Sequence, residues 1–292
     1  MALFKGVATA LITPFQNDNV DFAALEHLVD TQLKGGIAAL VVNGTTGEPT
    51  TMTHRERTAV ATAVIRQVNK KIPVIVGAGS NNTYTAVEYA VEAQELGADG
   101  ILAVTPYYNK CTQKGIVAHY KAMADAVDIP IIMYNVPGRT GVNINPETAE
   151  ELAGYKNIAG IKEASGNISQ IMEVARLTGG KMDLYSGDDG LVFPVLALGG
   201  LGVISVASNI MPQYMADMCN KFFEGDIAGS REMQFKIEPL IKALFCEVNP
   251  IPVKCAARLM GIIPDDYMRL PLTKLSKEEY LAKELRALGL IE

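Results

Sequence analysis

Short apolar runs recur along the chain, each followed by a turn and then by a segment with helical spacing of apolar positions. Runs that are apolar on both faces and alternate with helices are typical of buried parallel strands. The runs are GVATALIT (6–13), AALVV (38–42), PVIVG (73–77), GILAV (100–104), PIIMY (130–134), IAGIK (158–162), DLYS (183–186) and GVIS (202–205). Their spacing is close to one strand-plus-helix unit of roughly 30 residues.

Helices are predicted between these runs, and several have a capping residue at their start, such as Asp21, Thr53 and Asn167. The predicted helices include 22–34, 55–69, 83–96, 115–126 and 168–177. Eight strands alternating with helices favour an α/β fold of the closed (β/α)8 TIM barrel type. The alternative is an open doubly wound sheet, which usually needs a glycine-rich phosphate loop after its first strand. ALITPF contains no glycine, and GAGSNN (77–82) lacks the third glycine of a dinucleotide motif.

The alternation of apolar runs and helical segments ends near residue 225. Beyond it, helices are predicted at 229–247, 252–260 and 276–288. We therefore expect a barrel catalytic domain over 1–224 and a C-terminal helical domain over 225–292. The stretch 190–216 has no charged residue, but two prolines and several glycines interrupt it and basic flanks are missing. A buried helix followed by a buried strand explains this stretch better than a membrane span.

Composition narrows the classes of function. Hydrophobic residues make up 49% of the 292 residues, which suffices for a large core. The net charge is −6 and the basic residues form no stripe, so nucleic-acid binding is not expected. The four cysteines form no CxxC pair, and the N-terminus lacks a signal-peptide pattern, so we expect a cytoplasmic protein with free thiols.

IAGIK is an apolar strand that ends on a lysine, Lys162, and lysines are almost never buried unless they are paired or functional. Catalytic groups of this barrel type lie at the carboxyl ends of the strands, which is where Lys162 falls. A buried neutral amine can attack a ketone carbonyl and form a Schiff base. The phenol of Tyr134, at the end of the preceding strand, can carry the proton that this chemistry moves. The alternative is that Lys162 pairs with Glu163 or reaches the surface.

Other polar groups follow the same strand ends. Thr45 and Thr46 lie in NGTTGE, Tyr107 and Tyr108 in TPYYN, and Arg139 in NVPGRTG. A guanidinium suits a substrate carboxylate, although a surface ion pair is the alternative for Arg139. No HExxH motif or carboxylate cluster predicts a metal site, and acids such as Asp188 are favoured at helix starts anyway.

Seven motifs in order give the chain a resemblance to the pyruvate-dependent class I aldolase family, and within it to the branch of synthases. They are GTTGE (44–48), TPYYN (105–109), YNVPGRTG (134–141), GIKEASGN (160–167), SGDD (186–189), GVISV (202–206) and NPIPVK (249–254). The resemblance runs essentially end to end. It implies that pyruvate forms a Schiff base with Lys162 and condenses with L-aspartate-4-semialdehyde, on the route to diaminopimelate and lysine.

The resemblance also assigns roles by motif position. Tyr134 would be the proton donor and acceptor, with Thr45 and Tyr108 in a proton relay, and Tyr108 would be shared across a subunit interface. Pyruvate would be held by Thr46 and the backbone of Ile204, and the semialdehyde carboxylate by Arg139. Gly187 would be a further substrate-binding residue. No metal or organic cofactor is implied. A homotetramer, a dimer of dimers, is the first expectation and a dimer the second.

Three other functions remain open at this point. N-acetylneuraminate lyase has the same fold, lysine and tyrosine, but the arginine of YNVPGRTG, the double threonine and NPIPVK favour the synthase. A 2-keto-3-deoxy-sugar-acid aldolase is a further alternative. A non-catalytic barrel that binds keto acids would be expected to lack Lys162 or Tyr134, and both are present.

Lysine-inhibited family members have an allosteric pocket near the segment after GTTGE. His54, Asn81 and Tyr107 match its positions, but its second histidine position is Arg57 and its glutamate position is Thr85. The loss of a carboxylate partner for the ammonium of lysine, and the added positive charge, predict weak or absent inhibition by lysine.

Overall fold

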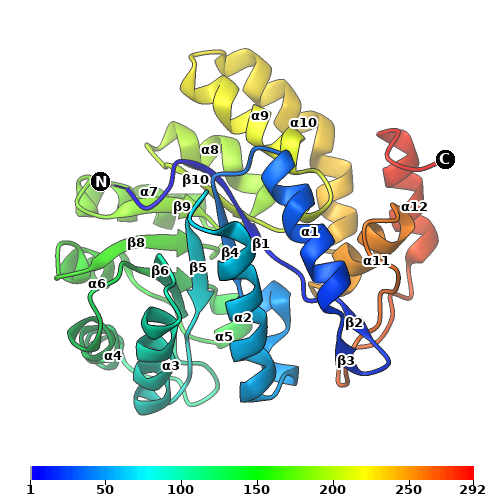
Figure 1. Cartoon of the computed structure of the whole chain (residues 1–292). Coiled ribbons are helices and arrows are strands. Elements are labelled where there is room, and N and C mark those ends of the chain that lie inside the picture. The colour runs from blue at the N-terminus through cyan, green and yellow to red at the C-terminus, as the bar shows by residue number, and fades with distance from the viewer. Residues whose placement is uncertain (1) are drawn as a thin grey trace. The chain divides into compact units, whose positions relative to one another are not determined.

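A computed structural model describes residues 2–292, and within them eight parallel strands close into a barrel (Figure 1). The order around the barrel is β1-β10-β9-β8-β7-β6-β5-β4. These strands are β1 (Gly6–Ala10), β4 (Ala39–Val42), β5 (Val74–Gly77), β6 (Gly100–Val104), β7 (Ile131–Asn135), β8 (Ile158–Glu163), β9 (Asp183–Ser186) and β10 (Gly202–Ser205). The predicted (β/α)8 TIM barrel is confirmed, and each predicted apolar run contains one strand.

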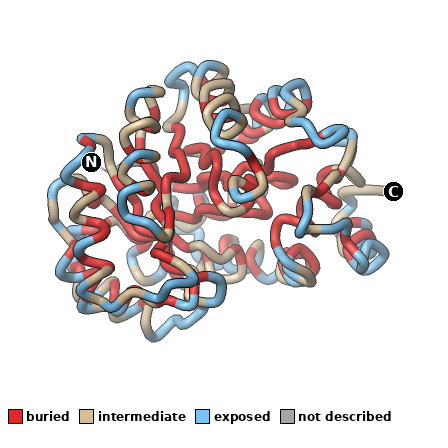
Figure 2. Tube along the Cα trace, turned by 90° about the horizontal axis from the view of Figure 1, so that it is seen from below, coloured by how far each residue is buried: buried red, intermediate tan, exposed pale blue. Residues whose placement is uncertain are grey.

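The strands are buried on both faces, as their sequences predict. β4 and β5 are built from Ala, Leu, Val, Ile and Gly, and every residue in them is buried. Figure 2 shows that buried residues follow the strands while exposed positions collect on helices and turns. Strands covered on both faces have no polar alternation, so their sequences are continuous apolar runs. The structure extends β7 and β8 by one residue beyond prediction, to Asn135 and Glu163.

Helices follow the strands at the predicted positions, and the three predicted caps are confirmed. The side chains of Asp21, Thr53 and Asn167 accept hydrogen bonds from backbone N–H groups of the first turn. The helices of this part of the chain are α1 (Phe22–Lys34), α2 (His54–Val68), α3 (Thr83–Glu95), α4 (Gln113–Ala126), α5 (Pro137–Thr140), α6 (Pro146–Leu152), α7 (Ile168–Thr178), α8 (Val192–Ala197) and α9 (Pro212–Phe223).

Some elements were not predicted. A short antiparallel pair, β2 (Phe15–Gln16) with β3 (Asn19–Val20), follows β1, and α5, α6 and α9 each begin with proline. Proline is compatible with the first turn of a helix because the N–H that it lacks has no partner there. The charge-free stretch 190–216 contains α8 and then β10, as expected, and no helix of residues 2–292 is long and apolar enough to cross a membrane.

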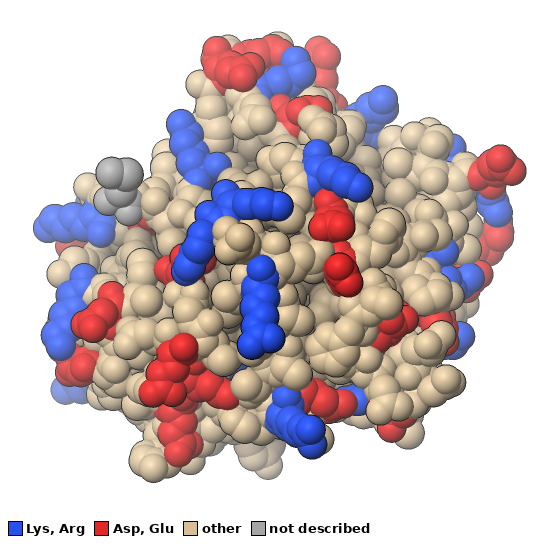
Figure 3. Space-filling model, in the orientation of Figure 1, with Lys and Arg blue, Asp and Glu red and all other residues tan. Residues whose placement is uncertain are grey.

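The C-terminal part of the chain is helical, as predicted, with α10 (Ile227–Leu244), α11 (Ile251–Leu259) and α12 (Glu278–Ala287). Contacts divide the chain into two compact units, one of 73–204 with the residues up to Gly6, the other of 7–72 and 205–292. The predicted boundary between residues 224 and 225 stays a prediction. On the face drawn in Figure 3, acidic and basic side chains are interspersed, with no continuous basic stripe.

Candidate active site

Tyr134 and Lys162 lie opposite each other at the carboxyl ends of β7 and β8. The pairing of these strands shifts between Ile131 and Ile132, and from there it places Tyr134 directly across from Lys162. Because a slip of one residue would turn a side chain to the other face, this register decides which pair meets. The Lys162 Nζ atom is 4.1 Å from the centre of the Tyr134 ring. The predicted proximity of amine and phenol is confirmed.

Both side chains are removed from water. Lys162 is 5% exposed and Tyr134 is 6% exposed. Within residues 2–292 no carboxylate forms an ion pair with Lys162, and the carboxylate of Glu163 is bonded instead to Asn135, Ser165 and Gln170. The structure therefore supports neither alternative for Lys162, an ion pair with Glu163 or a position at the surface. A buried amine without a counter-ion is suited to react as a nucleophile.

Gly187, a predicted substrate-binding residue, lies directly against the Lys162 side chain. A Cβ atom on Gly187 would be 2.9 Å from Lys162 Cε, 3.0 Å from its Cγ and 2.7 Å from Ala164 Cβ. These distances are too short for carbon atoms that are not bonded, so a side chain here would displace the lysine. The backbone N–H of Gly187 is bonded to the carbonyl of Glu163, at 2.8 Å. Glycine at this position makes room for the lysine.

The loops after β6 and β7 lie in the same unit and carry three more predicted residues. Tyr107 is half-buried, whereas Tyr108 is 89% exposed with its backbone in the left-handed region, at φ 72°. The N–H of Tyr108 is bonded to the carbonyl of Thr140, next to Arg139, which is exposed on α5. A large exposed aromatic on a sparsely populated backbone conformation favours a role in recognition.

The GTTGE motif forms a short 3-10 helix, Thr45–Gly47, in the other unit, directly after β4. Thr46 is buried and its hydroxyl accepts a hydrogen bond from the Asn249 side-chain amide, at 3.0 Å. Thr13 donates to the carbonyl of Gly47, at 2.7 Å. Thr46 and the turn at Gly47 are therefore held by residues from distant parts of the sequence.

Glu48 ends this motif and forms a fully buried ion pair with Lys254, at 2.7 Å. Lys254 also donates to the carbonyl of Tyr267, and its Nζ atom lies 4.5 Å from the centre of the Phe15 ring. Burial raises the pKa of Glu48 and lowers that of Lys254, and the attraction between the two charges opposes both changes. The pair joins the GTTGE and NPIPVK motifs.

The remaining predicted residues lie in the expected loops and strands, and their roles stay predictions. Ile204 is buried in β10, His54 is exposed at the start of α2, and Asn81 is half-buried with its carbonyl bonded to the Asn109 side chain. Asp188 caps the 3-10 helix Asp189–Leu191 by accepting from the N–H of Gly190. This hydrogen bond confirms the interpretation of Asp188 as a helix-start residue.

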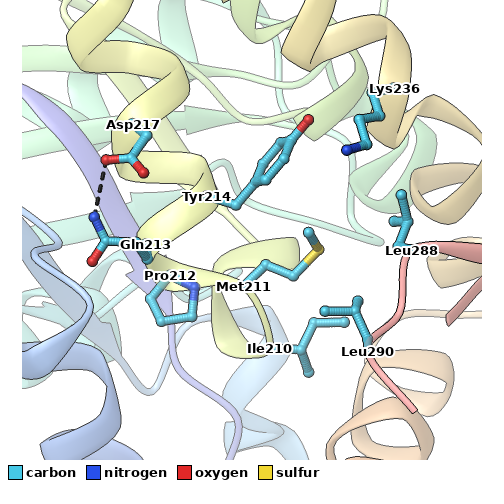
Figure 4. A pocket seen from close by; sticks show the side chains of 9 residues that line it. All are labelled: Ile210, Met211, Pro212, Gln213, Tyr214, Asp217, Lys236, Leu288 and Leu290. Carbon is cyan, nitrogen blue, oxygen red and sulfur yellow. Dashed lines mark hydrogen bonds between the residues drawn. The ribbon is translucent and has the colours of Figure 1, made fainter. Parts of the chain in front are cut away.

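Two other features of the described residues resemble binding sites. A cavity of about 410 Å³ near α9 contains none of the predicted catalytic residues (Figure 4), and its lining is Ile210, Met211, Pro212, Gln213, Tyr214, Asp217, Lys236, Leu288 and Leu290. Within residues 2–292, Cys255, Asp266 and Glu278 are the one group with metal-ligand spacing. The Arg258 guanidinium already bonds to Asp266 and Glu278, and burial raises the pKa of Cys255 to about 12. A guanidinium between these ligands disfavours a cation.

Comparison with known proteins decides the family. The model of the dihydrodipicolinate synthetase family matches residues 3–288. The chain belongs to this family. Its members are lyases of the class I aldolase type.

Relatives in the dihydrodipicolinate synthetase family match the whole chain. A 4-hydroxy-tetrahydrodipicolinate synthase of Caldicellulosiruptor bescii is 52% identical over 293 residues, covering 99% of both chains. The dihydrodipicolinate synthase structure from Thermotoga maritima is 47% identical with a TM-score of 0.97, covering 99% of this chain and 100% of that one. The lysine-bound structure from Cyanidioschyzon merolae is 42% identical with a TM-score of 0.96, covering 100% of both chains.

Some residues of the site were missed by sequence reasoning. Asn249, Glu48 and Lys254 lie in quoted motifs, but no role was predicted for them. Lys254 follows the run IPV and precedes CAA, so it is a second lysine among apolar residues, as Lys162 is in IAGIK. The pairing of Lys254 with Glu48 was hidden because 206 positions separate the two residues.

Proposed function

We propose that this protein condenses pyruvate with L-aspartate-4-semialdehyde, the reaction of a 4-hydroxy-tetrahydrodipicolinate synthase. The observation that carries the proposal is the buried Lys162 amine, 4.1 Å from the Tyr134 ring and without an ion-pair partner in residues 2–292. The names of relatives about half identical over the full length support the same reaction.

The reaction begins when the neutral amine of Lys162 attacks the ketone carbon of pyruvate. Loss of water from the carbinolamine leaves an iminium, which draws electrons from the pyruvate methyl carbon. That carbon loses a proton and becomes an enamine, which attacks the aldehyde carbon of the semialdehyde. The amino group of the second substrate then displaces Lys162 from the imine carbon, which closes the ring and frees the enzyme. Tyr134 exchanges the protons at the imine.

The proton relay is assigned to Tyr134, Thr45 and Tyr108. Support comes from their places in the chain, since each lies at or just after the carboxyl end of a parallel barrel strand. The relay connects the imine proton to solvent through hydroxyl groups. Because Tyr108 is 89% exposed in a single chain, we propose that it completes the site of a neighbouring subunit.

A homotetramer built from two dimers is therefore our first expectation and a dimer the second. One related structure, 46% identical, is described as a monomeric dihydrodipicolinate synthase variant. Sedimentation velocity at several concentrations gives the assembly directly. A monomer with full activity would remove the proposed role of Tyr108 across an interface.

Substrate carboxylates are assigned to two groups of donors. Thr46 and the backbone of Ile204 are proposed to hold pyruvate, and Gly187 is proposed as a further substrate-binding residue beside Lys162. Arg139, exposed on the short helix α5 just after β7, is proposed to take the carboxylate of the semialdehyde through a two-pronged contact.

Arg139→Ala separates these two substrates. We expect the variant to lose on the order of 100-fold in kcat/KM for the semialdehyde, because a charge-assisted bidentate contact contributes about 3 kcal/mol. Imine formation with pyruvate alone should stay within a few fold of the unmodified protein. A coupled assay with both substrates and adduct formation with pyruvate alone measure the two effects. Equal losses in both assays would contradict the assignment of Arg139.

The proposal needs no metal or organic cofactor, because the iminium that Lys162 forms with pyruvate is the electron sink. A cytoplasmic location belongs to the same proposal, supported by four cysteines that are all free thiols. We also keep 1–224 as the catalytic barrel domain and 225–292 as the helical domain.

Borohydride trapping tests the proposal. Reduction in the presence of pyruvate, followed by mass spectrometry of the peptides, should place one pyruvate-sized adduct on Lys162. Lys254→Met is not a suitable control here because Lys254 is structural, so Lys242→Met, an exposed lysine of α10, serves instead. An adduct on another lysine, or none, overturns the mechanism. Turnover of N-acetylneuraminate in place of the semialdehyde would assign the chain to the lyase branch.

A further inference from the structure

A buried polar network lies behind the pair of reactive side chains. Asn135 is paired with Glu163 in the same register that pairs Tyr134 with Lys162. Successive strand residues point to opposite faces, so Asn135 and Glu163 occupy the face opposite to the reactive pair. Glu163 is 1% exposed and Asn135 is 0% exposed. Both strand ends therefore carry a reactive side chain on one face and a buried polar side chain on the other.

The carboxylate of Glu163 is surrounded by donors. Its oxygens accept from Asn135 Nδ2 at 3.1 and 3.2 Å, from the Ser165 N–H at 2.8 Å and from Gln170 Nε2 at 3.3 Å. A carboxylate is a pure acceptor, so this set matches it without an unpaired group. No cation pairs with it within residues 2–292. A buried charge held by neutral donors alone is costly unless each bond is made, so its geometry is fixed.

Asn135 has no freedom to turn its amide round. Its Oδ1 atom accepts from the Ile144 N–H at 2.9 Å, and its Nδ2 atom donates to Asn143 Oδ1 at 2.9 Å as well as to Glu163. Exchange of the amide oxygen and nitrogen would place two donors against each other at Ile144. The network thus ties β7, β8 and the loop after α5 into one arrangement.

We propose that Glu163 is a positioning residue for the chemistry of Lys162. Its carboxylate fixes the ends of β7 and β8, so that the Tyr134 phenol and the Lys162 amine meet on the other face. This role rests on the proposed function, since it concerns the rate at which Lys162 forms an imine. A displacement of about 1 Å between reacting groups can slow a reaction by about 100-fold.

Glu163→Gln keeps the size of the side chain but replaces one acceptor by a donor. Because Asn135, Ser165 and Gln170 all donate, the new amide must oppose one of them. We expect imine formation with pyruvate, followed by rapid quenching into borohydride, to be about 10- to 100-fold slower. Asn135→Asp places two carboxylates face to face, so that acceptor opposes acceptor. Imine formation by this variant should also be slow.

The double variant Glu163→Gln with Asn135→Asp exchanges donor and acceptor. The new amide of residue 163 can donate to the new carboxylate of residue 135, which still accepts from Ile144 but now faces the Asn143 Oδ1 acceptor. Ser165 or Gln170 still donates toward the new amide, so we expect partial recovery, with imine formation at least about threefold faster than in Glu163→Gln. Glu173→Gln is the matched control, because Glu173 lies half-exposed on α7 and bonds only to Arg176 among the described residues. It should react at the unmodified rate.

The outcomes are distinct. Glu163→Gln within twofold of the unmodified rate, or a double variant no faster than Glu163→Gln, overturns the positioning role. If Glu163→Gln does not fold, Glu163→Asp, which keeps the charge but retracts it, carries the test with an expected loss of about tenfold. Absence of any adduct on Lys162 in the unmodified protein overturns the proposed function instead. Circular dichroism and thermal melting confirm that each variant is folded.

Discussion

Replacement of Lys254 by methionine isolates the buried ion pair beneath the GTTGE motif. Methionine matches the length of the lysine stem and removes only the charge and its hydrogen bonds. Glu48 then keeps a buried carboxylate whose Oε1 has lost its partner, and whose Oε2 has no hydrogen-bond partner in the described chain. Removal of one member of a buried pair costs about 3–5 kcal/mol.

This magnitude corresponds to a measurable fall in melting temperature. Unfolding entropy of about 2.1 cal/mol/K per residue gives about 0.6 kcal/mol/K for a chain of this length, so a loss of about 4 kcal/mol lowers Tm by about 7 °C. Lys254→Met with Glu48→Gln should recover at least about 1.5 kcal/mol, because no unpaired charge remains. Lys242→Met, at an exposed pair on α10, is the matched control and should change stability by less than about 0.5 kcal/mol.

The loss should also depend on pH. Burial raises the pKa of Glu48 above its unfolded value, and loss of the opposing Lys254 charge raises it further. A carboxyl with a raised folded pKa favours the folded state below its unfolded pKa, and this advantage is lost as pH rises through the folded pKa. The defect of Lys254→Met should therefore be smaller at pH 5 than at pH 8. Urea titrations at both values measure it, and a Tm within about 2 °C of the unmodified protein would refute the reasoning.

Three further predictions use other residues. Gly187→Ala should slow adduct formation at Lys162 by at least about tenfold, because the new methyl group would displace the lysine side chain. His119 is 2% exposed and burial lowers its pKa from 6.5 to about 4, so stability should fall by about 3 kcal/mol as pH drops through that interval. His119→Phe should flatten this dependence in urea titrations at pH 7 and 4.5. With Arg57 and Thr85 in the positions of the lysine pocket, 1 mM L-lysine should leave more than half of the activity.

Each of these three predictions has a result that would contradict it. If Gly187→Ala forms the borohydride-trapped adduct as fast as the unmodified protein, the Lys162 side chain can be accommodated beside the methyl group. An unmodified protein as stable at pH 4.5 as at pH 7 would mean that His119 titrates normally. Half-inhibition by lysine below 1 mM would show that a different set of donors recognises the ammonium and carboxylate of lysine.

The barrel was predictable because its strands are buried on both faces. A strand with two apolar faces has a sequence signature that does not depend on its partners, so the runs from GVATALIT to GVIS indicated both the number and the order of strands. Local hydrogen bonds likewise fixed the caps Asp21, Thr53 and Asn167. The lysine at the end of IAGIK was visible for the same reason, since a charge at the end of an apolar run stands out.

Only the tertiary structure decided which polar groups meet. The shifted pairing of β7 with β8 places Tyr134 opposite Lys162, and the same register brings Asn135 to Glu163 behind them. Glu48 meets Lys254 across 206 positions of sequence, and Asn249 meets Thr46 across 203. Long-range partners of this kind leave no local periodicity, because each depends on strand register and on how distant segments pack. The sequence by itself determined the barrel and the place of Lys162 at a strand end, and the packing of distant segments determined which side chains lie against Lys162 and Thr46.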